Sequence, residues 1–128
     1  MGFIKMGARV NFVFDDGTDS LVVLYSHWGA NSWQDDLRCA FEHAEPRLGD
    51  NSYWTRMVIS YLIQDEVLNE TGYGIFAISR NEINDLDSWA ETVVIDVANA
   101  TYNYLGFVSN AHLRNPLTPP IETDRIKV

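Results

Sequence analysis

The chain is short of the residues that build several common kinds of site. Cys39 is the sole cysteine among 128 residues, so an internal disulfide cannot form. A zinc site built on several cysteine thiolates is excluded for the same reason. His27, His43 and His112 lie far apart and lack the short spacings that mark metal ligands. We therefore expect neither a metal ion nor a cofactor.

Positive charge is also scarce. Nine lysine and arginine residues face 18 aspartate and glutamate residues, which gives a formal charge of −9. Such a surface repels both nucleic-acid phosphates and anionic lipid headgroups, so we expect no direct nucleic-acid binding and no membrane docking. Solubility explains this charge in the simplest way. An acidic protein that occupies a basic groove on a nucleic-acid enzyme is the alternative.

Long apolar runs are missing as well. No stretch approaches the roughly 18 residues of a membrane-spanning helix, and the first residues lack the layout of a signal peptide. These absences predict a cytoplasmic protein. A hydrophobic content of 46% is enough for one folded core, which we place in a single α+β domain over residues 1–109. Residues 110–128 carry Asn115-Pro116 and Pro119-Pro120, and we expect an extended or partly disordered tail there.

Strand patterns occur on both sides of a helical region. Residues 8–14 alternate between polar and apolar, and the turn signal Asp15–Asp19 leads into a second, continuously apolar strand over 21–25. The latter pattern indicates burial on both faces. Three further strands are predicted at 74–78, 92–97 and 101–105, and the segment 80–89 between them is predicted to be a polar loop.

Two helices are predicted between the strands. Ser32 is the expected N-cap of the first, with Asp35 completing a weak capping box, and Pro46 and Gly49 end it. The second begins near Asn51, and its wide apolar surface predicts a central position. The order β-β-α-α-β-β-β predicts an antiparallel sheet of about five strands with both helices packed on one face.

The strongest candidate for a site lies where the second strand ends, in Ser26-His27-Trp28-Gly29. An imidazole and an indole meet there at the end of a buried strand, where ligands often bind. The second candidate is the connection Glu70–Ile75, in which we interpret Gly72 as a helix C-cap and Gly74 as a point of close backbone approach. We expect these two segments to lie together. A purely structural histidine and a simple chain reversal are the alternatives.

Two arginines flank these segments, one on the second predicted helix and one after the third predicted strand. The candidate ligand-binding residues are therefore Ser26, His27, Trp28, Arg56, Glu70, Thr71, Tyr73 and Arg80. With so few cations, recognition should depend on shape and hydrogen bonding more than on charge. A multiply charged nucleotide would need arginines from two subunits. For a catalytic alternative, His27 needs an orienting carboxylate, and Asp96 is the candidate.

Three motifs stand in the order Leu24-Tyr25-Ser26-His27-Trp28-Gly29, Tyr53–Ile59 and Glu70-Thr71-Gly72-Tyr73-Gly74-Ile75. With them the chain resembles a group of small uncharacterised proteins of bacteriophages, prophages and related microbial genomes. The resemblance covers residues 8–97 and implies a viral or mobile-element context, and hence the cytoplasm of a host cell. It brings no established activity and no catalytic residues.

This resemblance, together with the lack of an evident catalytic set, implies a small non-enzymatic binding protein. Its expected role is to counter a host defence, by capturing a small nucleotide-like molecule or by blocking a host protein. A small hydrolase or transferase that uses His27 with a carboxylate is one alternative, and a structural or assembly component is another. The four Trp, six Tyr and six Phe exceed what so small a core needs, which predicts a homo-oligomer.

Overall fold

The fold is known from a computed structural model that describes residues 8–86, 90–107 and 122–125. Its elements, in chain order, are β1 (Val10–Asp15), β2 (Ser20–Ser26), η1 (Gly29–Asn31), α1 (Trp33–Ala44), η2 (Glu45–Arg47), α2 (Asn51–Ile63), β3 (Tyr73–Ser79), η3 (Arg80–Asp85), β4 (Glu91–Asp96), β5 (Thr101–Phe107) and β6 (Glu122–Arg125). The predicted order of two strands, two helices and three strands is confirmed, and β6 adds one strand to it.

The strands form one sheet in the order β3-β2-β1-β4-β5-β6. Four of the neighbouring pairs are antiparallel, but β1 and β4 run parallel, with Val10 opposite Glu91 and Asp15 opposite Asp96. The sheet is thus mixed, and the expectation of a purely antiparallel sheet is corrected at this pair. The reason lies in the connection. After β3 the chain crosses β2 and β1 by way of η3, and so enters β4 in the direction of β1.

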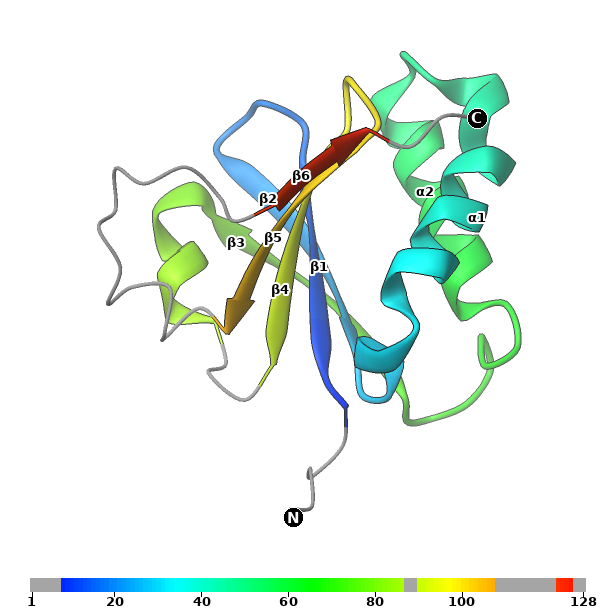
Figure 1. Ribbon diagram of the computed structural model, residues 1–128, viewed down its shortest axis with the longest axis vertical. Coiled ribbons are helices and arrows are strands. Elements are labelled where there is room, and N and C mark those ends of the chain that lie inside the picture. The colour runs from blue at the N-terminus through cyan, green and yellow to red at the C-terminus, as the bar shows by residue number, and fades with distance from the viewer. Residues whose placement is uncertain (1–7, 87–89, 108–121, 126–128) are drawn as a thin grey trace.

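Both long helices cover the same face of the sheet, as expected (Figure 1). The core between them and the strands is built from alternate residues of β1, β2 and β4, which point to one face. Helix α1 contributes five buried side chains, namely Trp33, Leu37, Ala40, Phe41 and Ala44. Among the described residues of helix α2, Trp54 and Val58 alone are buried, so the prediction of a central position for this helix was wrong.

The other face of the sheet carries a smaller apolar cluster beneath η3. Val13, Leu21 and Val23 point away from the long helices and pack with Leu86, while Ile83 of η3 flanks the cluster. The region predicted as a polar loop therefore contains a helical turn. Its start is a capping box, in which Ser79 N donates to Glu82 Oε1 at 2.8 Å. The capping box predicted at Ser32 is not formed. The Ser32 hydroxyl instead donates a hydrogen bond to Asp36 at 2.8 Å and makes no capping hydrogen bond to the helix backbone.

The predicted tail falls partly outside the described residues, since 108–121 and 126–128 are not among them. Within the tail, β6 pairs antiparallel with β5 and so belongs to the sheet. Among the described residues, no helix is both long and apolar enough to cross a bilayer.

Candidate functional site

The two segments singled out in the sequence meet at one end of the sheet. Strands β2 and β3 pair with Ser26 opposite Tyr73, and the pairing continues one step further as His27 N donates to Gly72 O at 2.9 Å. The expectation that His27 and Trp28 lie beside Glu70–Ile75 is confirmed. A β-ladder holds them together, so their relative positions are fixed by backbone hydrogen bonds rather than by loop conformation.

Gly29 makes the corner after β2 possible. A Cβ atom at this position would lie 2.6 Å from Ser26 Oγ and 3.1 Å from Val10 Cγ1. Any side chain would therefore push against the buried end of the strand, and the chain turns here only because there is none. The turn carries Trp28 outward, where 65% of the residue is exposed.

The two glycines of the second segment play different parts from those expected. Helix α2 ends at Ile63, nine residues before Gly72, so Gly72 is not its C-cap. It adopts φ +101°, and its missing Cβ would lie 2.6 Å from Glu66 Oε1. Gly74 is predicted to mark a close backbone approach, but no atom of the described residues lies within 4 Å of the position that its Cβ would occupy. Gly74 instead keeps space open above the sheet.

That space is part of a surface pocket of about 500 Å³. Its described lining is mostly apolar in character and consists of Tyr25, His27, Trp28, Thr71, Gly72, Tyr73 and Gly74. The His27 and Trp28 rings meet edge to face, with centroids 4.4 Å apart and planes at 86°. The Tyr25 hydroxyl lies 3.0 Å from His27 Nδ1 and fixes the imidazole from behind.

This geometry suits a flat ligand. An exposed indole offers a large face for stacking, and the imidazole and phenol offer hydrogen-bonding groups at its edge. No lysine or arginine is among the described residues of the lining.

Tyr25 was missed as a site residue, because the apolar run 21–25 was interpreted as buried on both faces. The available signal was strand alternation. Tyr25 and His27 are two residues apart and therefore point to the same face of the sheet.

Behind the pocket, Ser26 is buried at 2% exposure and faces Tyr73 across the ladder. Burial raises the pKa of the Tyr73 hydroxyl, and a hydrogen bond with Ser26 acts in the opposite direction. The Tyr73 phenol is therefore neutral at physiological pH and available as a hydrogen-bonding group. Glu70 lies next to Thr71 and is exposed, without lining the pocket.

The two candidate arginines do not join this site. Arg80 follows the last residue of β3, about 23 Å from Tyr73 by the rise of a strand. It makes a two-pronged ion pair with Asp15, at 2.7 and 2.9 Å. Arg56 is exposed on α2 and does not line the pocket. The expectation that these arginines flank a common site is therefore corrected. Arg80 lies at the end of β3 that is far from the pocket, and the position of Arg56 on α2 keeps it out of the pocket lining.

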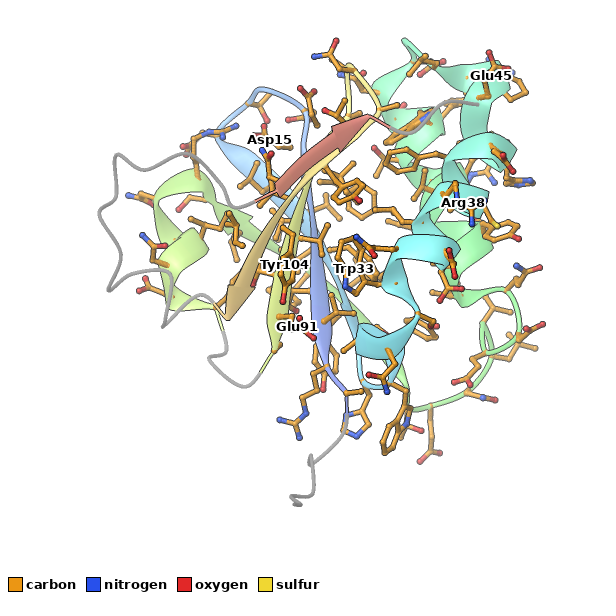
Figure 2. The ribbon with its side chains drawn as sticks, viewed as in Figure 1. Asp15, Trp33, Arg38, Glu45, Glu91 and Tyr104 are labelled. Atoms are coloured by element: carbon orange, nitrogen blue, oxygen red, sulfur yellow. The ribbon has the colours of Figure 1, made fainter. Side chains whose placement is uncertain are left out.

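The proposed catalytic pairing of His27 with Asp96 also fails on position. His27 follows the end of β2 that lies beside Val10 and Glu91, whereas Asp96 lies beside Asp15 at the other end of β4. The two ends are about 17 Å apart by strand rise. Figure 2 shows this separation through its labelled neighbours, with Asp15 at one end of the sheet and Glu91 at the other.

A second hollow, of about 250 Å³, adjoins the pocket on the helix side, and Tyr73 lines both. Its other described residues include Asp36, Asp65 and Glu66. This neighbouring negative charge, added to the absence of cations among the described residues of the pocket lining, disfavours an anionic ligand.

The aromatic residues of α1 and β5 form a structural cluster rather than a site. Trp33 stacks on Tyr104 with centroids 5.6 Å apart, and Tyr104 donates a hydrogen bond to Glu91 (Figure 2). Trp33 is only 6% exposed and belongs to the core.

Two buried polar side chains on the face opposite the helices were not singled out in the sequence. Asn11 and Thr92 stand opposite each other on β1 and β4 and are 2% and 0% exposed. Neither Asn11 Oδ1 nor Thr92 Oγ1 has a hydrogen-bond partner within the part of the chain that the structure describes. Their only signal in the sequence is a polar residue within each strand pattern, which alternation alone assigns to a solvated face.

Within the described part of the chain, no group of three or more histidine, cysteine, aspartate or glutamate side chains is placed to hold a metal ion. Comparisons of the chain with protein-family models, with curated protein sequences and with solved structures give no significant match. The resemblance to small phage and prophage proteins thus stays a prediction.

Proposed function

We propose that the protein is a non-enzymatic binding protein whose pocket between His27–Trp28 and Thr71–Gly74 holds a flat, uncharged ring. The observation that carries this proposal is the exposed Trp28 indole, braced edge to face by His27 beside the open space at Gly74. Large aromatic side chains are costly to expose, and one placed beside a pocket is a common way to bind a planar partner.

The favoured ligand is the heterocycle of a small nucleoside-like molecule. Base–aromatic stacking contributes about 1–3 kcal/mol per base, which a single indole can supply. The lack of cations in the described lining argues against tight binding of a polyphosphate, since phosphates are usually held by arginine, lysine or a helix N-terminus. Specificity then comes from Tyr25, His27, Thr71 and Tyr73, which surround the space with hydroxyl and imidazole groups.

In the phage context that the sequence suggests, such a protein would act in the cytoplasm of a host cell and capture a small signalling molecule of a defence system. The second form of the same activity is to block a host protein, which would insert one of its own aromatic side chains into the pocket beside Trp28. The hydrolase or transferase alternative finds less support, because Nδ1 of His27 is hydrogen bonded to the Tyr25 hydroxyl and Asp96 lies at the other end of the sheet.

Native mass spectrometry of the protein purified from its own source tests the proposal. We expect a bound small molecule with a heteroaromatic ring, released by the Trp28→Ala variant and retained by Tyr53→Ala. Tyr53 is a matched control because it is an aromatic residue 52% exposed on α2 and outside the pocket lining. A retained molecule that both variants hold equally would contradict the assignment of the pocket.

A further inference from the structure

The edge strand β3 has backbone groups that point away from the sheet. Its hydrogen bonds to β2 are made by alternate residues, as the bonds from His27 N to Gly72 O and from Arg80 N to Asp19 O establish. In an antiparallel ladder the residues between them turn their N–H and C=O groups the other way. In β3 these are Tyr73, Ile75, Ala77 and Ser79. Among the described residues β3 pairs with β2 alone.

This edge lacks the features by which proteins usually protect an open strand. Charges, prolines and bulges normally block pairing with another chain, and Tyr-Gly-Ile-Phe-Ala-Ile-Ser contains none of them. Ile75 is 59% exposed and Phe76 42% exposed. At the opposite edge, β6 has the sequence Glu-Thr-Asp-Arg, which is of the protected kind.

We propose that β3 pairs antiparallel with β3 of a second copy, about a two-fold axis at Ile75. The register follows from the groups that are available. Ser79 N is already used by Glu82, so Tyr73, Ile75 and Ala77 are the residues with both backbone groups to offer. Only an axis at Ile75 matches all three, pairing Ile75 with the partner's Ile75 and Tyr73 with the partner's Ala77.

A second copy is the occupant that fits this edge best. The edge is uncharged in a chain of net charge −9, so two copies can approach there without bringing like charges together. Pairing of β3 with itself is closed and isologous, whereas pairing of β3 with the charged β6 of another copy would continue without end. The two sheets would then join into one.

This register adds a wall to the pocket. Gly74 would lie opposite the partner's Phe76 as a pair without mutual hydrogen bonds, in which side chains come closest. Both residues belong to the face opposite the helices, since Gly74 pairs with Tyr25 and Phe76 with Val23. The phenyl ring of each copy would cover the open space beside the glycine of the other. The ligand-binding consequence rests on the proposed function, but the pairing itself does not.

Sedimentation velocity without any ligand tests the pairing. We expect a dimer for the natural protein and a monomer for Ile75→Lys, which sets two lysines against each other on the axis. Leu68→Lys is the matched control, because Leu68 is 94% exposed in the connection before β3 and should leave the dimer intact. A monomeric natural protein, or a dimer that survives Ile75→Lys, would overturn the proposal.

Cysteine cross-linking tests the register in a Cys39→Ala background. Ile75→Cys should form a disulfide-linked dimer on oxidation, because opposed residues of a hydrogen-bonded pair have Cα atoms about 5.5 Å apart, within disulfide reach. Leu68→Cys should not. Cross-linking by Phe76→Cys in place of Ile75→Cys would place the axis elsewhere and overturn the register. A natural protein that forms the β3-paired dimer but binds no ligand would count against the proposed function and leave the pairing standing.

Discussion

Gly74 carries much of the account at the residue scale. It is a glycine within a strand, without a positive φ and with open space where its side chain would be. Neither turn geometry nor crowding requires a glycine there. The remaining physical consequence of the glycine is the room it leaves between Tyr25 and Tyr73.

Replacing Gly74 by valine should therefore separate stability from binding. We expect Gly74→Val to raise the free energy of unfolding by about 0.5–1 kcal/mol, because glycine costs entropy in a strand and a β-branched residue favours it. The same variant should lose ligand binding, because its side chain occupies the pocket. Urea unfolding and a binding titration measure the two effects. A destabilised variant would show that Gly74 is needed for the fold instead.

A second prediction at this scale concerns the buried hydroxyl of Thr92. This hydroxyl is fully buried and has no partner among the described residues, so Thr92→Val exchanges an unsatisfied polar group for a methyl of similar shape. The variant should be more stable by about 1 kcal/mol in urea unfolding. The half-buried Thr101 is the control, and Thr101→Val should change stability by less than about 0.5 kcal/mol. A loss of stability in Thr92→Val would contradict the assignment of the hydroxyl as unsatisfied.

Sequence reasoning found part of this site and missed the rest for definite reasons. Ser26, His27 and Trp28 stood out because a titratable and an aromatic residue follow a buried strand. Tyr25 did not, because the apolar run 21–25 indicates burial on both faces, although the two-residue spacing from His27 places both side chains on one face. Arg56 and Arg80 flank the site segments in the sequence, but the length of β3 carries Arg80 to the far end of the sheet.

At the scale of elements, the ion pair of Asp15 with Arg80 joins the end of β1 to the start of η3. The hydrogen bond from Arg80 lowers the pKa of Asp15 below its usual value of 3.8, while partial burial acts in the opposite direction. A carboxylate with a folded-state pKa below its unfolded one stabilises the fold above the unfolded pKa. That contribution is lost as the pH falls through the folded pKa, so the relevant window lies below about pH 4.

Asp15→Asn should remove this part of the pH dependence. We expect the variant to be slightly less stable than the natural protein at pH 7, and the difference to shrink as the pH falls below about 4. Urea midpoints at a series of pH values measure it. Asp35→Asn is the control, since its ion pair with Arg38 is more exposed and joins residues of one helix only. A constant difference between Asp15→Asn and the natural protein at all pH values would contradict this account.

The same scale shows where pattern reasoning about elements succeeds and stops. Alternation and helical spacing depend on neighbours in sequence, and they gave the order of strands and helices and the side of the sheet that α1 and α2 cover. The parallel pairing of β1 with β4 joins residues about 80 apart, and no local pattern encodes it. The helical turn of η3 does have a local signal, because Ser79 and Glu82 have the spacing of a capping box, but the polar composition of 80–89 favours a loop.

For the whole molecule, the charge of −9 opposes the association proposed through β3. Two like-charged chains repel each other across a Debye length of about 10 Å at 0.1 M salt, and added salt screens this repulsion. Raising the salt concentration from low to physiological should therefore tighten the dimer, as sedimentation equilibrium can measure. A dimer that dissociates as salt is added would require an interface held by ion pairs, which β3 does not have.

The central claim is that Trp28 provides the stacking surface for a flat, uncharged ring. Calorimetric titration of the natural protein, Trp28→Ala and Tyr53→Ala with the four ribonucleosides and with ATP tests it most directly. We predict that at least one nucleoside binds the natural protein and Tyr53→Ala equally, binds Trp28→Ala about tenfold more weakly or worse, and binds better than ATP. Binding that is unchanged in Trp28→Ala, or that favours ATP over every nucleoside, would contradict the account.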